Sequence, residues 1–177
     1  MIHQLFGIPI WEETFDASKL DLQCKFTKQW ESQTETSFGS ENKLTQPSID
    51  YLSKQLSLFT NSIMQDRKCK IEIKEFWMTR YGFKDFQEAH VHNWTHFSFT
   101  IFKNIPKNCG QFKFVHPLAE WVQTYTHLKI PSLLPKLWSE QKPNTILIFP
   151  SFLRHMVTPG TTKKIRETYS GNFNILV

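Results

Sequence analysis

Residues 149–159 of the chain read Phe149-Pro150-Ser151-Phe152-Leu153-Arg154-His155-Met156-Val157-Thr158-Pro159. They close an apolar run that begins at residue 145, and Arg166-Glu167-Thr168 follows them. A histidine just past an apolar strand, with an arginine eleven residues later, suits a metal ligand beside an anion-binding group. The segment therefore predicts a metal site that binds a small molecule carrying carboxylates.

The hydrophobic pattern around this segment predicts one helix followed by many strands. Pro47-Ser48 supplies a helix start, and a helix-like spacing follows it in Ile49, Leu52, Leu56, Phe59 and Ile63. From residue 70 onward the period is two, which predicts strands at residues 70–74, 76–81, 97–103, 111–115, 145–149 and 165–177. The change of face between the first two of these segments indicates a β-bulge.

The connecting segments complete a mainly β fold with flanking helices. Residues 31–47 are polar and predict an exposed connection, and residues 117–128 have the spacing of a short helix. A helix laid on many short strands predicts a cupin-like double-sheet jelly roll, with the N-terminal helix packed on the major sheet.

Composition limits the classes of protein and of partner. The 177 residues suit a single domain spanning residues 1–177. The net charge of +5 comes from scattered lysines, which is no strong nucleic-acid signal. Three cysteines without a close pair, no signal peptide and no apolar run long enough for a membrane predict a cytoplasmic protein.

The segment His90-Val91-His92 is the second candidate for metal binding. In a strand, residues two apart point to the same face, so both imidazoles can reach one ion. The pair alone is weak evidence, and His155 strengthens it because a separate strand edge would supply the third ligand. His96 is an alternative ligand, although the residues before it resemble a bend.

Arg166 opens the C-terminal strand, where Thr168, Ser170, Asn172 and Asn174 share its face. This polar face either meets solvent or looks into the barrel, and the nearby His155 favours the barrel. Arg166 would then bind a carboxylate in bidentate fashion, with the Thr168 hydroxyl as a further donor.

These residues resemble a known family. Gln87 to His92, Gly110 to Pro117 and the 149–159 segment with Arg166 are similar to the 2-oxoglutarate and Fe(II)-dependent oxygenases of the small bacterial and phage type, in the double-stranded β-helix superfamily. The resemblance implies His90 and His155 as iron ligands and Arg166, assisted by Thr168, as the anchor of 2-oxoglutarate. It also implies Fe(II), 2-oxoglutarate and O2 as cofactor and cosubstrates, and decarboxylation to succinate coupled to hydroxylation of an unknown substrate.

One position departs from the family pattern. Most members of the superfamily have HxD or HxE, whereas this chain has His92 at the third position. We therefore expect His90, His92 and His155 to hold the metal. Glu88 and Asp85 are the nearest upstream carboxylates, and Glu88 could replace one of the ligands or hydrogen-bond to one of them. The alternatives are a non-catalytic jelly-roll binding module and a three-histidine dioxygenase that does not use 2-oxoglutarate.

The partners are less closely defined by the sequence. The substrate is an unknown small molecule or peptide, and a homodimer is left open. Four side chains near the motifs are candidates for a substrate pocket, namely Trp77, Arg80, Trp94 and Arg154.

Overall fold

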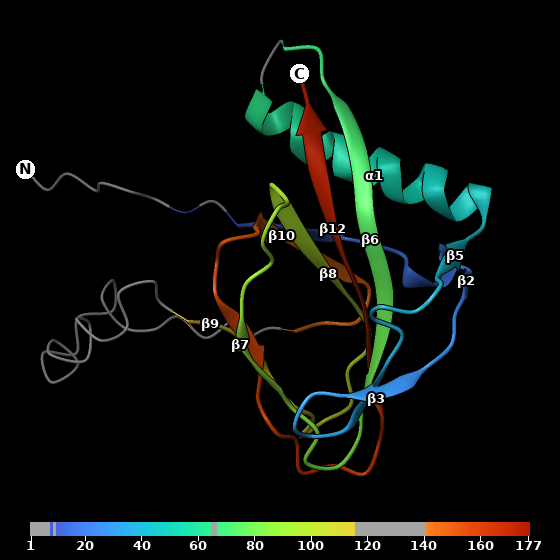
Figure 1. Ribbon diagram of the computed structural model, residues 1–177, viewed down its shortest axis with the longest axis vertical. Coiled ribbons are helices and arrows are strands. Elements are labelled where there is room, and N and C mark those ends of the chain that lie inside the picture. The colour runs from blue at the N-terminus through green and yellow to red at the C-terminus, as the bar shows by residue number, and fades with distance from the viewer. Residues whose placement is uncertain (1–7, 9, 65–66, 116–140) are drawn as a thin grey trace, which may run out of the picture.

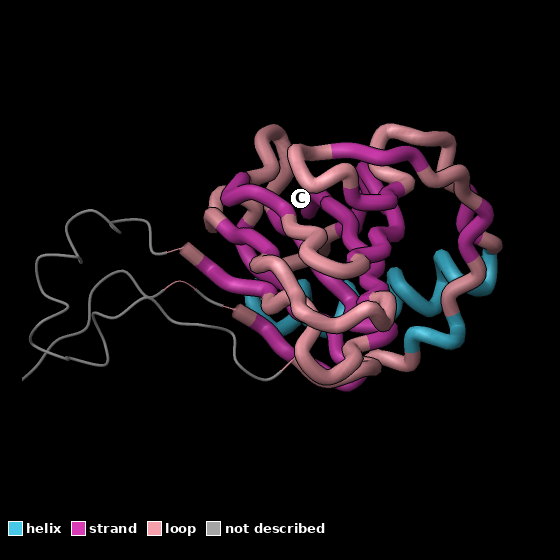
Figure 2. The backbone as a smooth tube through the Cα atoms, turned by 90° about the horizontal axis from the view of Figure 1, so that it is seen from below, coloured by secondary structure: helices cyan, strands magenta, loops and turns pink. Residues whose placement is uncertain are grey.

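The computed structural model describes residue 8 and residues 10–64, 67–115 and 141–177 of the chain. These residues form a seven-stranded, a three-stranded and a two-stranded sheet, all antiparallel, with helix α1 (Gln46–Met64) on the outside of the strands (Figures 1 and 2). No helix of the described part is long and apolar enough to cross a membrane.

The major sheet has the strand order β1-β10-β8-β12-β6-β4-β3. Its strands are β1 (Trp11–Thr14), β10 (Thr145–Pro150), β8 (Phe97–Asn104), β12 (Arg166–Leu176), β6 (Lys70–Tyr81), β4 (Thr34–Thr36) and β3 (Thr27–Gln29). The long central strands β6 and β12 run side by side through the molecule (Figure 1).

The remaining strands form a smaller, three-stranded sheet and a few short elements. The minor sheet has the order β7-β11-β9, with β7 (Gln87–His90), β11 (His155–Val157) and β9 (Phe112–Phe114). The remaining elements are β2 (Leu22–Gln23), β5 (Lys43–Leu44) and the short 3-10 helix η1 (Ala17–Lys19). The minor sheet faces the major one, which is the double-stranded β-helix arrangement that the sequence predicted.

The side of the major sheet that carries α1 is apolar where the helix packs on it. Leu52, Leu56 and Phe59 of the helix pack against Phe173 and Tyr169 of β12 and against neighbouring strands. The helical spacing therefore predicted the packed face correctly except at its end, because Ile63 is exposed and Thr60 is buried instead. Transfer of this apolar surface out of water is the main stabilising contribution.

Close contact between strands explains the glycine at position 171 of β12. A Cβ atom there would lie 2.4 Å from Cζ of Phe99 and 2.5 Å from the backbone oxygen of Glu75. Since neither the packed ring nor the neighbouring backbone can withdraw, only glycine fits.

The expected bulge lies in β6 at Lys74. Asn172 pairs with Glu75 and the next residue, Phe173, pairs with Ile73, so Lys74 has no partner across the ladder. The extra residue changes which side chains face the barrel. Ile73 and Phe76 both meet the α1 side, while Trp77 and Tyr81 face the interior.

Two expectations about connections have different outcomes. The exposed connection at residues 31–47 was wrong, because it contains β4 and β5, and Thr34, Thr36 and Ser37 are fully buried. The Thr36 hydroxyl lies 3.0 Å from that of Thr79 on β6, which satisfies the buried polar groups. The short helix expected at residues 117–128 lies outside the described residues.

Candidate active site

The inner face of the major sheet is polar where it looks toward the minor sheet. On β12 the residues Arg166, Thr168 and Asn172 are buried, each with 2% or less of its surface exposed. Arg166 and Thr168 line a cavity together with Trp77 and Tyr81 of β6 and the minor-sheet histidines. The alternative in which this strand face meets solvent is therefore excluded.

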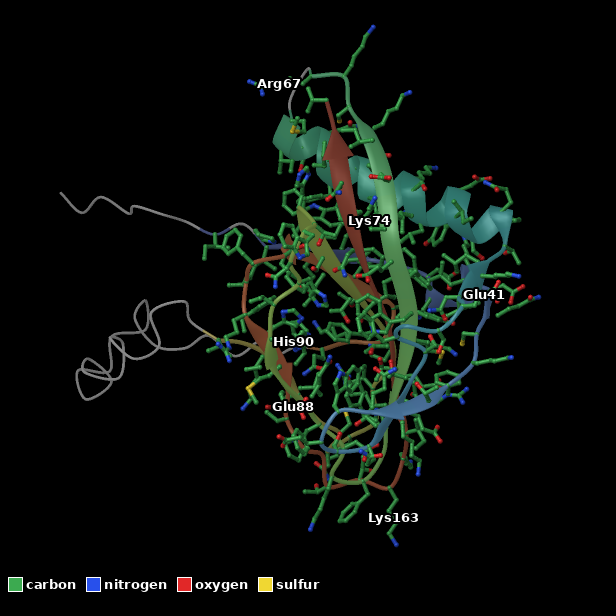
Figure 3. The ribbon with its side chains drawn as sticks, viewed as in Figure 1. Glu41, Arg67, Lys74, Glu88, His90 and Lys163 are labelled. Atoms are coloured by element: carbon green, nitrogen blue, oxygen red, sulfur yellow. The ribbon has the colours of Figure 1, made fainter. Side chains whose placement is uncertain are left out.

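His90 and His155 are direct neighbours across the minor sheet. His155 is the first residue of β11 and pairs with His90, the last residue of β7, so both imidazoles leave the sheet at one level. Their ring centroids are 4.3 Å apart. Figure 3 labels His90 on its strand.

His92 reaches the same place from a loop. The expectation of one regular strand through His90 and His92 was wrong, because β7 ends at His90. The backbone N–H of His92 donates to the carbonyl of Ser151 at 3.0 Å, which fixes the loop against the segment before His155. One ring nitrogen from each of His90, His92 and His155 lies within 4.8 Å of the others, a group that could hold a metal ion.

Burial keeps these imidazoles neutral. Loss of hydration is the largest cause in each case: it lowers the pKa of His90, lowers the pKa of His92 to about 4, and lowers the pKa of His155 well below its ordinary value. The proximity of His90 adds to the lowering for the other two rings. At neutral pH each ring is therefore uncharged and has one unprotonated nitrogen.

Arg166 occupies the other end of the cavity. Its guanidinium lies over the rings of Tyr81 and Phe102, at 4.8 and 5.7 Å from their centroids. Nη2 donates to Oε1 of Gln141 at 3.1 Å, while Nε and Nη1 are buried and have no hydrogen-bond partner among the described residues. Buried donors of a charged group without a partner cost free energy, so an anionic ligand would satisfy them.

Tyr81 and Gln141 are site residues that the sequence reasoning missed. Burial raises the pKa of Tyr81 to about 12, so its hydroxyl stays protonated, and it donates to Oε1 of Gln87 at 3.0 Å. For Tyr81 a sequence signal existed, because it ends a strand of alternating pattern. The structure adds that it pairs with Arg166. Gln141 lies 25 residues from Arg166 in an irregular segment, where no periodicity marks it.

The structure places the other candidate ligands elsewhere. The carboxylate of Glu88, also labelled in Figure 3, accepts the backbone N–H of Glu31 at 2.9 Å, and that of Asp85 accepts the N–H of Gly82 at 2.7 Å. Nδ1 of His96 accepts the N–H of Ile175 at 3.1 Å, a structural role. The cluster that could hold a metal therefore contains neither of these carboxylates.

Of the four candidate substrate contacts, only one lines the cavity. Trp77 is 5% exposed and lines the cavity, whereas Trp94 is 96% exposed. Arg80 pairs with Glu167 at 3.2 Å and lies over the ring of Phe26, facing away from the site. Arg154 is exposed and donates to the carbonyl of Ala89 at 3.2 Å.

Solved structures similar to this chain share its fold. An oxidoreductase of the 2OG-Fe(II) oxygenase family from Burkholderia pseudomallei has 15% identity and a TM-score of 0.56, over 94% of this chain and 73% of its own. HygX from Streptomyces hygroscopicus, solved with nickel, 2-oxoglutarate and hygromycin B, has 11% identity and a TM-score of 0.55, over 94% and 83%. The viral collagen prolyl hydroxylase of Paramecium bursaria Chlorella virus-1, in complex with 2-oxoglutarate, has 13% identity and a TM-score of 0.54, over 81% and 80%.

Sequence comparison identifies the family. No curated protein sequence matches the chain. The model of the family described as "Putative 2OG-Fe(II) oxygenase" matches residues 75–173, which is more than half of the 177 residues and runs from within β6 to within β12. The chain thus belongs to the family of 2OG-Fe(II) oxygenases, enzymes that use Fe(II), 2-oxoglutarate and O2.

Proposed function

We propose that His90, His92 and His155 hold Fe(II) and that Arg166, assisted by Thr168, binds the distal carboxylate of 2-oxoglutarate. One observation carries this proposal: the same cavity contains three neutral imidazoles and a buried guanidinium with two unpartnered nitrogens among the described residues. A dicarboxylate would have one negative end toward a metal ion held by the histidines and the other toward the guanidinium of Arg166.

The donor set fits a divalent ion of the first transition row. Imidazole suits iron, and three neutral rings leave coordination positions open for cosubstrates. When bound, the iron supplies the oxidative chemistry that converts 2-oxoglutarate to succinate and hydroxylates a carbon–hydrogen bond. The site differs from the two-histidine, one-carboxylate pattern because His92 contributes no negative charge.

The remaining cavity residues would bind, orient and exclude water. A carboxylate on Arg166 would form charge-assisted hydrogen bonds in a region of low dielectric, where such bonds are strong. The hydroxyl of Thr168 lies on the same strand face, two residues away, and offers one more donor. Phe112 and Phe149 pack on His155, with ring centroids at 5.4 and 4.9 Å, and shield that side of the site from water.

The substrate would approach from the side opposite Arg166. A second cavity beside His90 and His92 is lined by Trp30, Phe38 and Trp77. Aromatic walls suit a small molecule or a peptide side chain. The similar structures include a viral collagen prolyl hydroxylase and an enzyme solved with hygromycin B.

We also propose that residues 1–177 form one oxygenase domain that works in the cytoplasm. The described thiols Cys24, Cys69 and Cys109 are all free, as suits a reducing compartment. A homodimer is a prediction that sedimentation equilibrium would check.

The direct test is anaerobic titration of the protein with Fe(II) and 2-oxoglutarate. The weak visible charge-transfer band should appear, and Arg166→Ala should remove it. Succinate formation that depends on iron and O2 would exclude a non-catalytic module. A reaction that consumes O2 but is unchanged in Arg166→Ala would instead indicate a three-histidine dioxygenase without 2-oxoglutarate.

A further inference from the structure

His90 and His155 share one hydrogen-bonding arrangement. Nδ1 of His90 lies 2.7 Å from the carbonyl oxygen of Glu88, and Nδ1 of His155 lies 2.9 Å from that of Leu153. A carbonyl oxygen only accepts, so Nδ1 carries the proton in both neutral rings and Nε2 keeps its lone pair. This second-shell contact is the one that metal-binding histidines usually make.

His92 makes the opposite contact. Its Nδ1 lies 3.3 Å from the amide nitrogen Nδ2 of Asn172. That nitrogen also donates to the carboxylate of Glu75, while Oδ1 of Asn172 accepts the hydroxyl of Ser98 at 2.7 Å. A carboxylate only accepts, so Glu75 fixes the NH2 end of the amide toward itself and toward His92. Nδ1 of His92 then accepts, and its proton is on Nε2.

We propose that Glu75 and Asn172 are positioning residues that hold His92 in its Nε2–H form in the metal-free protein, and that His92 joins the metal through Nε2 only once the Asn172 amide rotates. The inference rests on the proposed function, in which the histidine cluster holds Fe(II). Rotating the amide by half a turn would present Oδ1 to Nδ1–H of His92 and free the lone pair of Nε2.

The neighbours of Asn172 differ in which orientation they allow. The Ser98 hydroxyl can donate or accept, so it permits both orientations of the amide. Glu75 permits only the observed one, because the reversed amide would bring two acceptor oxygens together. Asn172 is 1% exposed, so water cannot replace the lost partner cheaply. Glu75 is exposed, and its carboxylate decides which orientation the amide takes.

Glu75→Gln tests the inference with almost no change of shape. The glutamine amide can either accept from Nδ2 or donate to Oδ1 of Asn172, so it no longer fixes one orientation of that side chain. In metal-free protein with ¹⁵N-labelled histidine, nitrogen chemical shifts identify the protonated nitrogen of each ring. We expect only Nε2–H for His92 in the wild type and a population of Nδ1–H rings in Glu75→Gln; the absence of Nδ1–H rings from Glu75→Gln would overturn the inference. An Nδ1–H ring for His92 in the wild type would overturn the inference.

Metal affinity gives the second readout. Anaerobic Fe(II) titration should show about 10- to 100-fold tighter binding in Glu75→Gln, the usual size of a second-shell effect. Glu72→Gln is the matched control, since its carboxylate pairs with Lys74 at 3.1 Å, and it should bind like the wild type. Equal affinity in Glu75→Gln and wild type would overturn the inference.

Failure of the proposed function looks different. In that case the wild type would bind no Fe(II), or His90→Ala would bind it equally well, whereas the imidazole tautomers would still follow the substitution at Glu75. The two hypotheses are thus separated by one set of samples.

Discussion

The two faces of strand β12 differ in what they contribute. Tyr169, Phe173 and Ile175 face helix α1 and are buried among apolar side chains. Arg166, Thr168 and Asn172 face the cavity and are equally buried, yet all are polar. Alternation along one strand thus separates residues that stabilise the fold from residues that bind ligands. Substitutions on the two faces should therefore change different measurements.

The largest effect is expected from Phe173→Ala on the α1 face. Phe173 is fully buried against Phe59 and Phe97, so the cavity left behind should lower the free energy of unfolding by about 3–5 kcal/mol. Urea denaturation measures this loss. Leu176→Ala, at an exposed position of the same strand, is the control and should lower it by less than about 0.5 kcal/mol. Loss of 2-oxoglutarate affinity in the folded Phe173→Ala protein would contradict the separation of the faces.

Arg166→Leu should have the next largest effect, and on binding rather than folding. Removal of a buried charged partner typically costs about 2–5 kcal/mol, so 2-oxoglutarate affinity measured by calorimetry should fall at least about 30-fold. Stability should change little, because the substitution also removes buried donors without partners. Arg80→Leu on the neighbouring strand, which faces away, should keep its affinity. Equal affinity losses in both variants would show a general charge effect instead.

Acidification should weaken the cavity side through its histidines. The folded-state pKa values lie below the ordinary 6.5, so between about pH 6.5 and pH 4 the unfolded chain binds protons that the folded protein does not. The free energy of unfolding of metal-free protein should therefore fall as pH falls through this window, with His92 accounting for about 2 kcal/mol. The free energy of unfolding of the His92→Asn variant should fall less steeply over the same pH range. Parallel curves for the two proteins would show that His92 does not contribute.

The smallest effect is expected from Thr168→Val, which removes one hydroxyl but keeps the shape. Loss of a single hydrogen bond should weaken 2-oxoglutarate binding by about 1 kcal/mol, or about fivefold. Calorimetry measures the change, and Thr79→Val is a control on the neighbouring strand, where the hydroxyl bonds Thr36 instead. An affinity change in Thr79→Val as large as in Thr168→Val would argue against a direct contact.

Much of the fold was predictable because its central strands alternate cleanly and its helix carries an apolar stripe. Strands β3 and β4 were not predictable. The threonines of β4, Thr34 and Thr36, resemble loop residues and are buried only because β4 pairs with the distant β6. Their hydroxyls find partners more than 40 residues away, which no local pattern records.

The site was predictable to a similar degree. The sequence placed His90, His92 and His155 at one site, and the three side chains lie together in the structure, while their binding of a metal stays a prediction. The route of His92 through a loop was not foreseen, nor was its contact with Asn172. That contact joins residues 80 positions apart, and a hydrogen bond between them depends on the folded register.

The bulge at Lys74 lets one strand follow two sequence phases. Before it, the odd-numbered Ile71 and Ile73 meet the core beneath α1, and after it the even-numbered Phe76 and Met78 do so. If Lys74 took an ordinary place in the ladder, every later residue of β6 would turn to the opposite face, and Trp77 and Met78 would exchange environments. The one unpaired residue in β6, rather than the identity of any side chain there, thus brings Trp77 and Tyr81 to the cavity.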